Sequence, residues 1–242
     1  MNKLLSVLMV VAILGLSACG SAPIKQAPQG LLKGSTDVSI SFQNNPERTG
    51  ALFQMTGYTI FSIPIVAAAA SKMNSQSAEL SAAYSQYHKD HPEIQSLKDT
   101  FNSELESNLL KRGLNITKVS AVKKVNDQKE VTYDVNQSEV KSKLVVVIDG
   151  LTSQYWAPSS TDNYAPQSAA LISIIDTSNP LAKPQQIVQK DDSNPEKVGT
   201  YSYNNFDSLS KDTGKSYEGL QQSVIRLADN VAKFLIENET KQ

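Results

Sequence analysis

The most constraining feature of this sequence is a wide apolar stripe that runs through residues 215–237. Its apolar residues recur at three- and four-residue steps, which is the repeat of one face of an α-helix. They are Tyr217, Leu220, Val224, Leu227, Val231 and Leu235, with Ala228 and Phe234 widening the stripe. A helix of this kind must bury its apolar face against another layer, so we expect it to lie on a β-sheet.

A second amphipathic helix is predicted over residues 92–112, where the apolar residues follow the same spacing. They are Ile94, Leu97, Phe101, Leu105 and Leu109. Pro92 suits the first turn of this helix, with Asp90 or His91 as its cap, and Gly113 suits its end.

Five segments have the composition of β-strands, because β-branched and aromatic residues dominate or alternate in them. They are residues 37–42, 114–125, 143–151, 168–176 and 198–204. The continuous apolar run Leu144–Ile148 indicates a central strand. The order of strand, helix, several strands and helix predicts an α+β fold, a mixed β-sheet with two long amphipathic helices packed on it.

The chain contains a single cysteine, Cys19, at the end of an apolar run. Residues 1–18 begin with one basic residue, Lys3, and continue with the apolar stretch Leu4–Leu16 and small residues, which is the layout of a secretory signal peptide. The apolar stretch is shorter than the roughly 20 residues that cross a membrane, so we expect the segment to be cleaved.

The tetrapeptide Leu16-Ser17-Ala18-Cys19 resembles the lipobox of bacterial lipoproteins. The resemblance implies cleavage before Cys19 and a diacylglyceryl group on its thiol. Gly20 stands where an aspartate would retain such a protein at the inner membrane. We therefore expect a lipid anchor in the outer membrane, with the body of the protein in the periplasm.

The remaining sequence divides into a short linker and one domain. Residues 19–36 are rich in Pro, Gly, Ser and Gln and are predicted to form a flexible tether, and residues 37–242 are long enough for one substantial core. The 23 basic and 24 acidic residues give a net charge of −1 without a basic patch, which excludes a typical nucleic-acid-binding protein.

Residues 37–43 and 92–238 together resemble the amino-terminal domain of TolB and similar domains of periplasmic auxiliary lipoproteins. The resemblance lies in the helix that ends in LLKRGLNI, the strands KLVVVIDG and ALISIIDTSN, and the closing helix. It implies a binding or assembly role toward another envelope protein or a cell-wall component, without enzymatic activity or a cofactor. It transfers no functional residues.

Residues 49–71 carry no charge and depart from that pattern. Because Gln54, Pro64 and other polar or glycine positions interrupt the segment, a buried hairpin or helix within the fold is favoured over a membrane span. Contact with a membrane or with other copies of the chain remains the alternative, and it would make the protein an oligomeric, pore-like lipoprotein. A cell-wall hydrolase is a third possibility that rests on location alone. The segment that follows is expected to be an exposed polar helix or arm.

Two short motifs could carry chemistry, and neither is complete. His88 and His91 form an H-x-x-H string at a helix boundary, without an indicated third ligand, so a solvated cap is favoured over a metal site. The string TGKS at 213–216 lacks the glycine that a phosphate-binding loop needs five residues before Gly214, so it predicts a helix start. We expect no catalytic residues and no bound metal.

The best sequence-based candidate for partner recognition is the polar segment 152–167 between two apolar strands. It holds Tyr155, Trp156 and Tyr164 among Ser, Asn and Pro, a composition typical of recognition surfaces. The alternative is that these aromatic side chains fold back over the sheet, which is the more frequent fate of aromatic residues.

Overall fold

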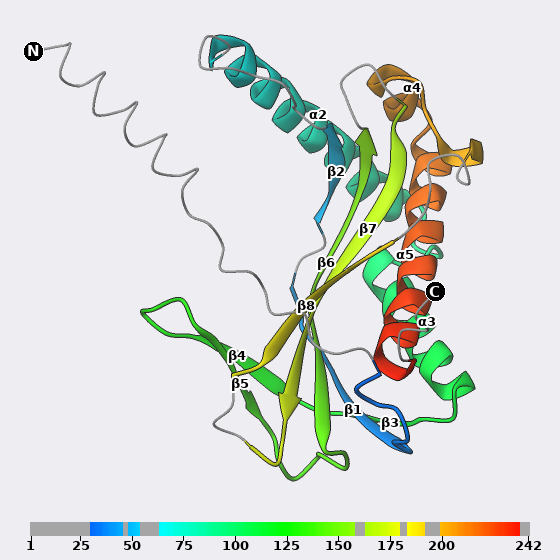
Figure 1. Ribbon diagram of the computed structural model, residues 1–242. Helices are drawn as coiled ribbons and strands as arrows, with labels where there is room; N and C mark the ends of the chain where they lie inside the picture. Colours follow the sequence, from blue (N-terminus) through cyan, green and yellow to red (C-terminus); the bar gives the residue numbers. More distant parts are fainter. Residues whose placement is uncertain are drawn as a thin grey trace, which may run out of the picture.

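The computed structural model describes residues 30–45, 48–53, 63–157, 163–179, 183–191 and 199–237. These residues form a six-stranded mixed β-sheet that carries helices on one face and a two-stranded ribbon on the other (Figure 1). The α+β fold predicted from the sequence is therefore confirmed.

The central sheet has the strand order β3-β1-β6-β7-β8, and β2 also pairs with β6. Its strands are β1 (Asp37–Phe42), β2 (Arg48–Phe53), β3 (Asn115–Lys118), β6 (Leu144–Ala157), β7 (Ala165–Asp176) and β8 (Gln185–Lys190). The pairs β1–β3, β1–β6 and β2–β6 are parallel, whereas β6–β7 and β7–β8 are antiparallel. β6 is thus the central strand that the apolar run Leu144–Ile148 predicted.

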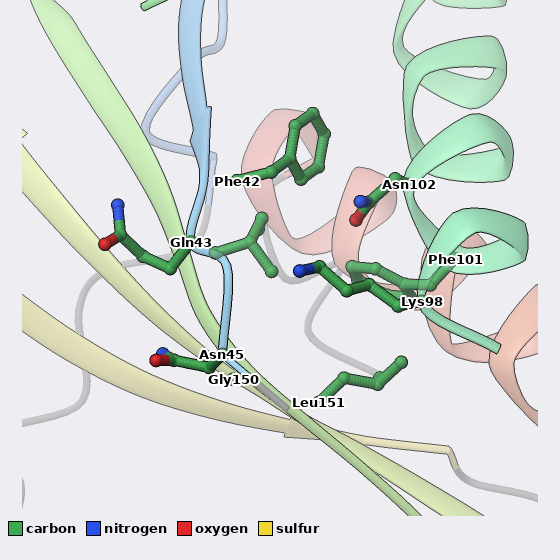
Figure 2. Close-up of a pocket in the computed structure, with 9 residues that line it drawn as sticks. Phe42, Gln43, Asn45, Lys98, Phe101, Asn102, Gly150 and Leu151 are labelled. Carbon is green, nitrogen blue, oxygen red and sulfur yellow. The ribbon is translucent and has the colours of Figure 1, made fainter. Parts of the chain in front are cut away.

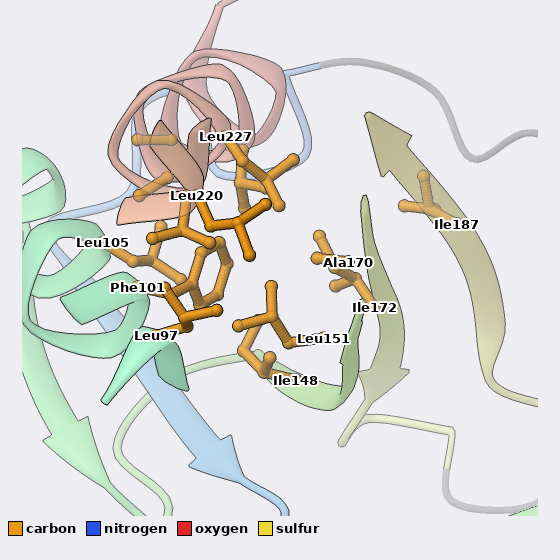
Figure 3. Packing of buried hydrophobic residues seen from close by; sticks show 14 of the residues in the cluster. Leu97, Phe101, Leu105, Ile148, Leu151, Ala170, Ile172, Ile187, Leu220 and Leu227 are labelled. Carbon is orange, nitrogen blue, oxygen red and sulfur yellow. The ribbon is translucent and has the colours of Figure 1, made fainter. Parts of the chain in front are cut away.

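Among the described residues, four helices accompany the sheet: α2 (Ile63–Asp90), α3 (Leu97–Lys111), α4 (Phe206–Lys211) and α5 (Thr213–Ile236). α3 and α5 lie next to each other on one face of the sheet, and α2 lies along β2. Leucines of α3 and α5 meet the branched side chains of β6 and β7 in the core that Figure 3 shows. Two long helices packed on one sheet were predicted, and this arrangement is confirmed.

The start of α3 differs from the prediction. Asp90 is the last residue of α2, and α3 begins only at Leu97 with Ser96 as its cap. The Ser96 side chain accepts a hydrogen bond of 3.0 Å from the backbone N–H of Asp99, which satisfies one of the free donors in the first turn. The predicted caps Asp90 and His91 are therefore wrong, whereas Gly113, with φ of +84°, does follow the helix end.

The strand predictions are correct in part. Residues 37–42 are β1, and 114–125 divide into β3 and β4 (Ala121–Val125). Residues 198–204 form no named strand in the part that is described, and Tyr203 makes only an isolated bridge with Tyr164. β2, β8 and β5 (Val131–Val135) were not predicted.

The uncharged segment 49–71 contributes to two elements. Its start belongs to β2, where Ala51 is buried, and its end belongs to α2, which begins at Ile63 with Pro64 in the first turn. A proline is tolerated there because the N–H it lacks would have no helical acceptor. Residues 54–62 lie outside the described residues. Among the described helices, none is both long and apolar enough to cross a membrane.

The polar segment after residue 71 is helical, as predicted, and most of its side chains are exposed or half-buried, but two of them dock this part of α2 on the body. Leu80 and Tyr84 are buried in the main core. The predicted tether is also shorter than expected, because the backbone N–H groups of Gly30 and Leu32 donate to the last carbonyl groups of α5 at 2.9 and 2.8 Å. Residues 30–35 thus belong to the folded body.

The face opposite the helices is covered only in part. β4 and β5 form an antiparallel ribbon, and Val119, Ala121 and Val135 pack against Val145 and Val147 of β6. This small second cluster covers the first half of β6.

Candidate functional site

The sheet is interrupted where β1 ends and β2 begins. β1 pairs with β6 up to Ile148, and β2 pairs with it from Thr152 onward. Opposite this gap, the register of β6 against β7 shifts between Ile148 and Gly150, so Asp149 lies in a β-bulge. Bulges redirect a side chain and are frequent next to functional sites.

Side chains from the connection between β1 and β2 hold the gap together. The side-chain amide of Asn45 donates to the carbonyl oxygen of Asp149, and that of Gln43 donates to the carbonyl oxygen of Ala121 at 2.7 Å. Figure 2 shows both amides pointing away from α3, whereas Phe42 points toward it. The hollow on the α3 side holds only about 10 Å³, about enough for one water molecule.

A much larger cleft opens on the other face of the same gap. It encloses about 440 Å³ between the ribbon and the second half of the sheet. β6, β7 and β8 supply its floor, and the β1–β2 connection, the start of β2 and β4 supply its sides. The lining residues are Asn45, Arg48, Lys123, Asp149, Gly150, Leu151, Thr152, Ala169, Ala170, Leu171 and Val188.

The most unusual group in this cleft is the carboxylate of Asp149, whose side chain is fully buried. Its Oδ2 lies 2.6 Å from Nζ of Lys123, which is 33% exposed. Its Oδ1 is also buried and has no hydrogen-bond partner among the described residues. Burying an unpaired charge costs free energy, and the ion pair with Lys123 offsets that cost for the Asp149 carboxylate.

Tyr133 and Ser173 complete the polar group under the ribbon. The two hydroxyl oxygens lie 3.0 Å apart. Burial, helped by the negative charge of Asp149 nearby, raises the pKa of Tyr133 to about 12. Tyr133 therefore stays protonated at neutral pH.

The described lining of the cleft carries more positive than negative charge. Among these residues Arg48 and Lys123 face the cleft against one carboxylate, that of Asp149, and Lys190 lies just beyond it. In the described part of the chain, neither Arg48 nor Lys190 forms an ion pair with an acidic side chain. The arrangement therefore favours an anionic ligand over a cationic one.

No protein-family model, curated protein or solved structure matches this chain. The candidate site therefore stands on its geometry alone, and the resemblances to the lipobox and to TolB stay predictions.

The structure corrects two of the three aromatic residues predicted for partner recognition. β6 extends to Ala157 and β7 begins at Ala165, so most of segment 152–167 is strand. Tyr155 is fully buried and its hydroxyl donates to the Ser216 carbonyl of α5 at 3.1 Å. Tyr164 is buried as well.

These two tyrosines cannot present a recognition surface, because their rings complete the core on the helix side, as the alternative interpretation of the sequence had it. Trp156 is half-buried in β6, and its role in partner binding stays a prediction. Cys19, the predicted lipidation site, lies outside the described residues.

The two remaining motifs, the histidine pair and the string TGKS, are parts of the fold. The His91 ring lies 3.3 Å from Glu93, and the His88 ring stacks on Tyr217. The described residues contain no group of three or more potential metal ligands. The string TGKS at 213–216 forms the first turn of α5, which confirms the predicted helix start.

Proposed function

We propose that the protein is a lipoprotein anchored in the outer membrane through Cys19, and that its periplasmic body is a non-enzymatic binding module. In this proposal the cleft beside Asp149 is the ligand-binding site. The lipobox-like sequence supports the anchor. The cleft supports the binding role, because it is concave, charged and built on a rigid sheet.

The observation that carries the proposal is the half-satisfied carboxylate of Asp149 in the floor of an open cleft. A protein that needed only stability could place an apolar residue at this position, as β6 does at Val145 and Val147. The lining residues that the structure describes include one hydroxyl, that of Thr152, and neither histidine nor cysteine. This set supplies charge and shape for binding and lacks the usual nucleophile–base pair.

Gly150 offers a way to test the cleft without disturbing the fold. A Cβ atom at Gly150 would have no heavy atom within 4 Å, and the backbone there is not in the left-handed region. Gly150→Leu should therefore fill the cleft from its floor. Gly199 has the same open surroundings outside the cleft, so Gly199→Leu is a matched control.

The test uses the full-length lipoprotein in cells, with a photoreactive phenylalanine in place of Val188, which is 45% exposed at the cleft. We expect covalent adducts with an envelope component that disappear in Gly150→Leu and persist in Gly199→Leu. Adducts that Gly150→Leu leaves unchanged would contradict the cleft as the binding site.

The lipid anchor is tested separately. Cys19→Ala should abolish labelling with a fatty-acid analogue and release the protein from the outer membrane, and continued labelling would refute the anchor.

The alternative of a membrane-inserting, oligomeric lipoprotein was predicted from residues 49–71, of which 54–62 lie outside the described residues. None of the described contacts of this segment favours it.

A further inference from the structure

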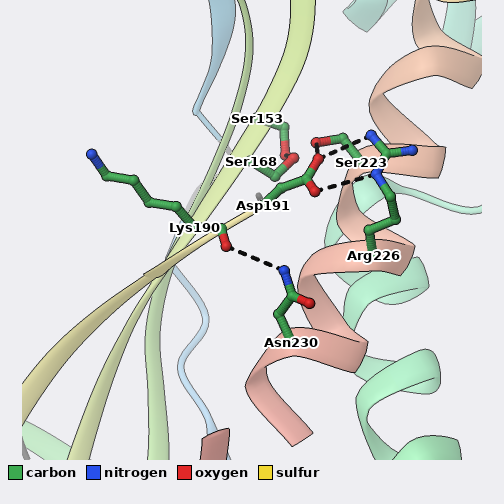
Figure 4. Close-up of polar contacts among 7 residues, drawn as sticks. All are labelled: Ser153, Ser168, Lys190, Asp191, Ser223, Arg226 and Asn230. Atoms are coloured by element: carbon green, nitrogen blue, oxygen red, sulfur yellow. Dashed lines mark hydrogen bonds and ion pairs between the residues drawn. The ribbon is translucent and has the colours of Figure 1, made fainter. Parts of the chain in front are cut away.

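Four residues form a row across the open face of the sheet. The strand register places Arg48 opposite Thr152, Thr152 opposite Ala169, and Ala169 opposite Lys190. Directly opposed residues in a sheet project from the same face. Figure 4 agrees, because the side chain of Lys190 extends away from α5. The row therefore carries one cation at each end and two small side chains between them.

The length of this row can be estimated from the spacing of strands. β2, β6, β7 and β8 are successive neighbours, so three steps of about 4.8 Å separate the backbones at Arg48 and Lys190, roughly 14 Å in all. Two anionic groups about that far apart match the spacing of the backbones that carry the two cations.

An aliphatic row lies directly beside the charged one. Gly150 is opposite Leu171, and Leu171 is opposite Val188. All three line the cleft, and Gly150 leaves its floor open. The middle of the site therefore suits a small or medium apolar group and offers little to a polar one.

An extended peptide matches both rows. Its side chains alternate in direction and its backbone advances by about 3.4 Å per residue, so two residues four positions apart point the same way at a separation of roughly 14 Å. The residue midway between them points the same way too. Two acidic side chains would reach Arg48 and Lys190, and an apolar side chain between them would enter the cleft.

We infer that the cleft binds an acidic segment of a partner protein, laid in extended form across β2, β6, β7 and β8. The motif it takes is an acidic residue, an apolar residue two positions later and a second acidic residue two positions after that. This inference rests on the proposed binding function and names its ligand class.

The buried pair of Asp149 and Lys123 gives the site a means of rejection. An acidic side chain at the middle position would lose water against Leu171 and Val188 and would gain no free cation, because the Asp149 carboxylate already holds the Lys123 ammonium. Desolvating a charge without pairing it costs free energy. The site therefore selects against a continuous acidic run as well as for the two outer charges.

Two other anionic partners fit less well. An acidic polysaccharide would set hydroxyl groups against the aliphatic row, where the described lining offers few hydrogen bonds. An anionic bilayer is broad and flat, and membrane-binding surfaces insert exposed apolar groups rather than enclose a cleft.

The experiment measures binding of fluorescein-labelled peptides to the full-length lipoprotein in detergent micelles by anisotropy. The first peptide carries two aspartates four positions apart with a valine midway. The second has the same composition with the aspartates three positions apart, so that they face opposite ways. The third has an aspartate in place of the valine. We expect the first to bind about tenfold more tightly than either of the others, and more weakly as salt rises.

Charge variants identify the contacts. Arg48→Gln and Lys190→Gln should each weaken the first peptide by about three- to tenfold and reduce its preference over the second. Lys111→Gln removes an exposed charge from α3 in the helix layer and should change nothing. Equal affinities for the two spacings would overturn the inference. It would be overturned equally by variants without effect, or by stronger binding of polygalacturonate or of vesicles that contain phosphatidylglycerol.

Two outcomes distinguish a wrong ligand class from a wrong binding site. If none of the peptides binds while the adducts formed at Val188 still disappear in Gly150→Leu, the cleft binds a ligand of another class. If Gly150→Leu leaves those adducts unchanged, the cleft is not the binding site at all.

Discussion

Two buried carboxylates lie on opposite faces of the sheet, and they differ in how completely they are paired. Asp191 directly follows β8 on the helix-covered face, and Figure 4 shows it held from α5. It accepts hydrogen bonds from Nε and Nη2 of Arg226 at 3.2 and 2.9 Å and from the hydroxyl of Ser223 at 2.8 Å. Asp149, on the open face, is paired with the Lys123 ammonium and lies near the Tyr133 hydroxyl, and its Oδ1 accepts no hydrogen bond from the described residues.

The difference separates a structural role from a binding role. A bidentate contact with arginine fixes both oxygens of a carboxylate, so Asp191 anchors the end of β8 to α5. A single contact with a lysine leaves the other oxygen unsatisfied and the ammonium partly exposed to a ligand. Folding stability is thus provided mainly by the helix face, whereas the open face leaves the Lys123 ammonium partly exposed to the cleft.

The largest effects are expected in the core between the helices and the sheet. Leu105 and Leu227 are fully buried there, and Figure 3 shows both among the packed side chains. Leu105→Ala and Leu227→Ala should each lower the free energy of unfolding by about 2–5 kcal/mol through the cavity that they leave. Urea denaturation followed by circular dichroism measures this.

Val135→Ala, in the small cluster under the ribbon, is the counterpart on the open face and should cost less than either leucine variant, because fewer buried residues surround it. A loss below about 0.5 kcal/mol for either leucine variant would mean that its helix is not docked on the sheet.

The next effects compare the two ion pairs directly. Arg226→Met should cost about 3 kcal/mol, because it leaves the Asp191 carboxylate, whose side chain is 1% exposed, with a single hydroxyl donor from this network. Lys123→Met should cost about as much, roughly 3 kcal/mol, because it leaves the fully buried carboxylate of Asp149 without its ion-pair partner. A loss below about 1 kcal/mol in urea denaturation for either variant would contradict the role given to its ion pair. Binding to the cleft should be impaired only in Lys123→Met.

The helix layer was predictable because the spacing of apolar residues that defines each helix lies within a single segment of the sequence. The stripe through Tyr217, Leu220 and Leu227 predicts α5 to within about two residues at its start, since periodicity and burial coincide there. The start of α3 was misplaced because Pro92 suits a first turn, whereas the reciprocal hydrogen bonds of Ser96 and Asp99 determine the cap. β8 was missed because QQIVQK is a polar edge strand with a single buried isoleucine.

The candidate site was less predictable, and only part of it left a signal in the sequence. Asp149 and Gly150 interrupt an apolar strand, and residues of both types are depleted in strands and frequent at bulges. That signal was available. Arg48 and Lys190 were not predictable, because strand pairings between distant segments bring them to the cleft. Lys123 was not predictable either, because it meets Asp149 only through the packing of the ribbon on β6, which no local pattern encodes. Tyr155 was wrongly predicted to contact a partner, because the polar residues around it in the sequence give no sign that its side chain points into the core.

The smallest effect concerns alkaline pH and distinguishes the tyrosines of the two faces. Burial raises the pKa of Tyr155 on the helix face far above its ordinary value of about 10, and that of Tyr133 on the open face to about 12. A group whose pKa is higher in the folded state contributes stability that is complete below its unfolded pKa and is lost as pH rises toward the folded one. The urea midpoint should therefore be steady to about pH 10 and fall above it. Between pH 10 and 12, Tyr133→Phe and Tyr155→Phe should each flatten this fall by a similar amount, because both hydroxyls stay largely protonated in the folded protein there. Above about pH 12 only Tyr155→Phe should still flatten it, although this variant also loses a hydrogen bond at neutral pH. If Tyr133→Phe still flattened the fall above pH 12 as much as Tyr155→Phe, the tyrosine of the open face would be as strongly protected as that of the helix face, and the contrast between the two faces would fail.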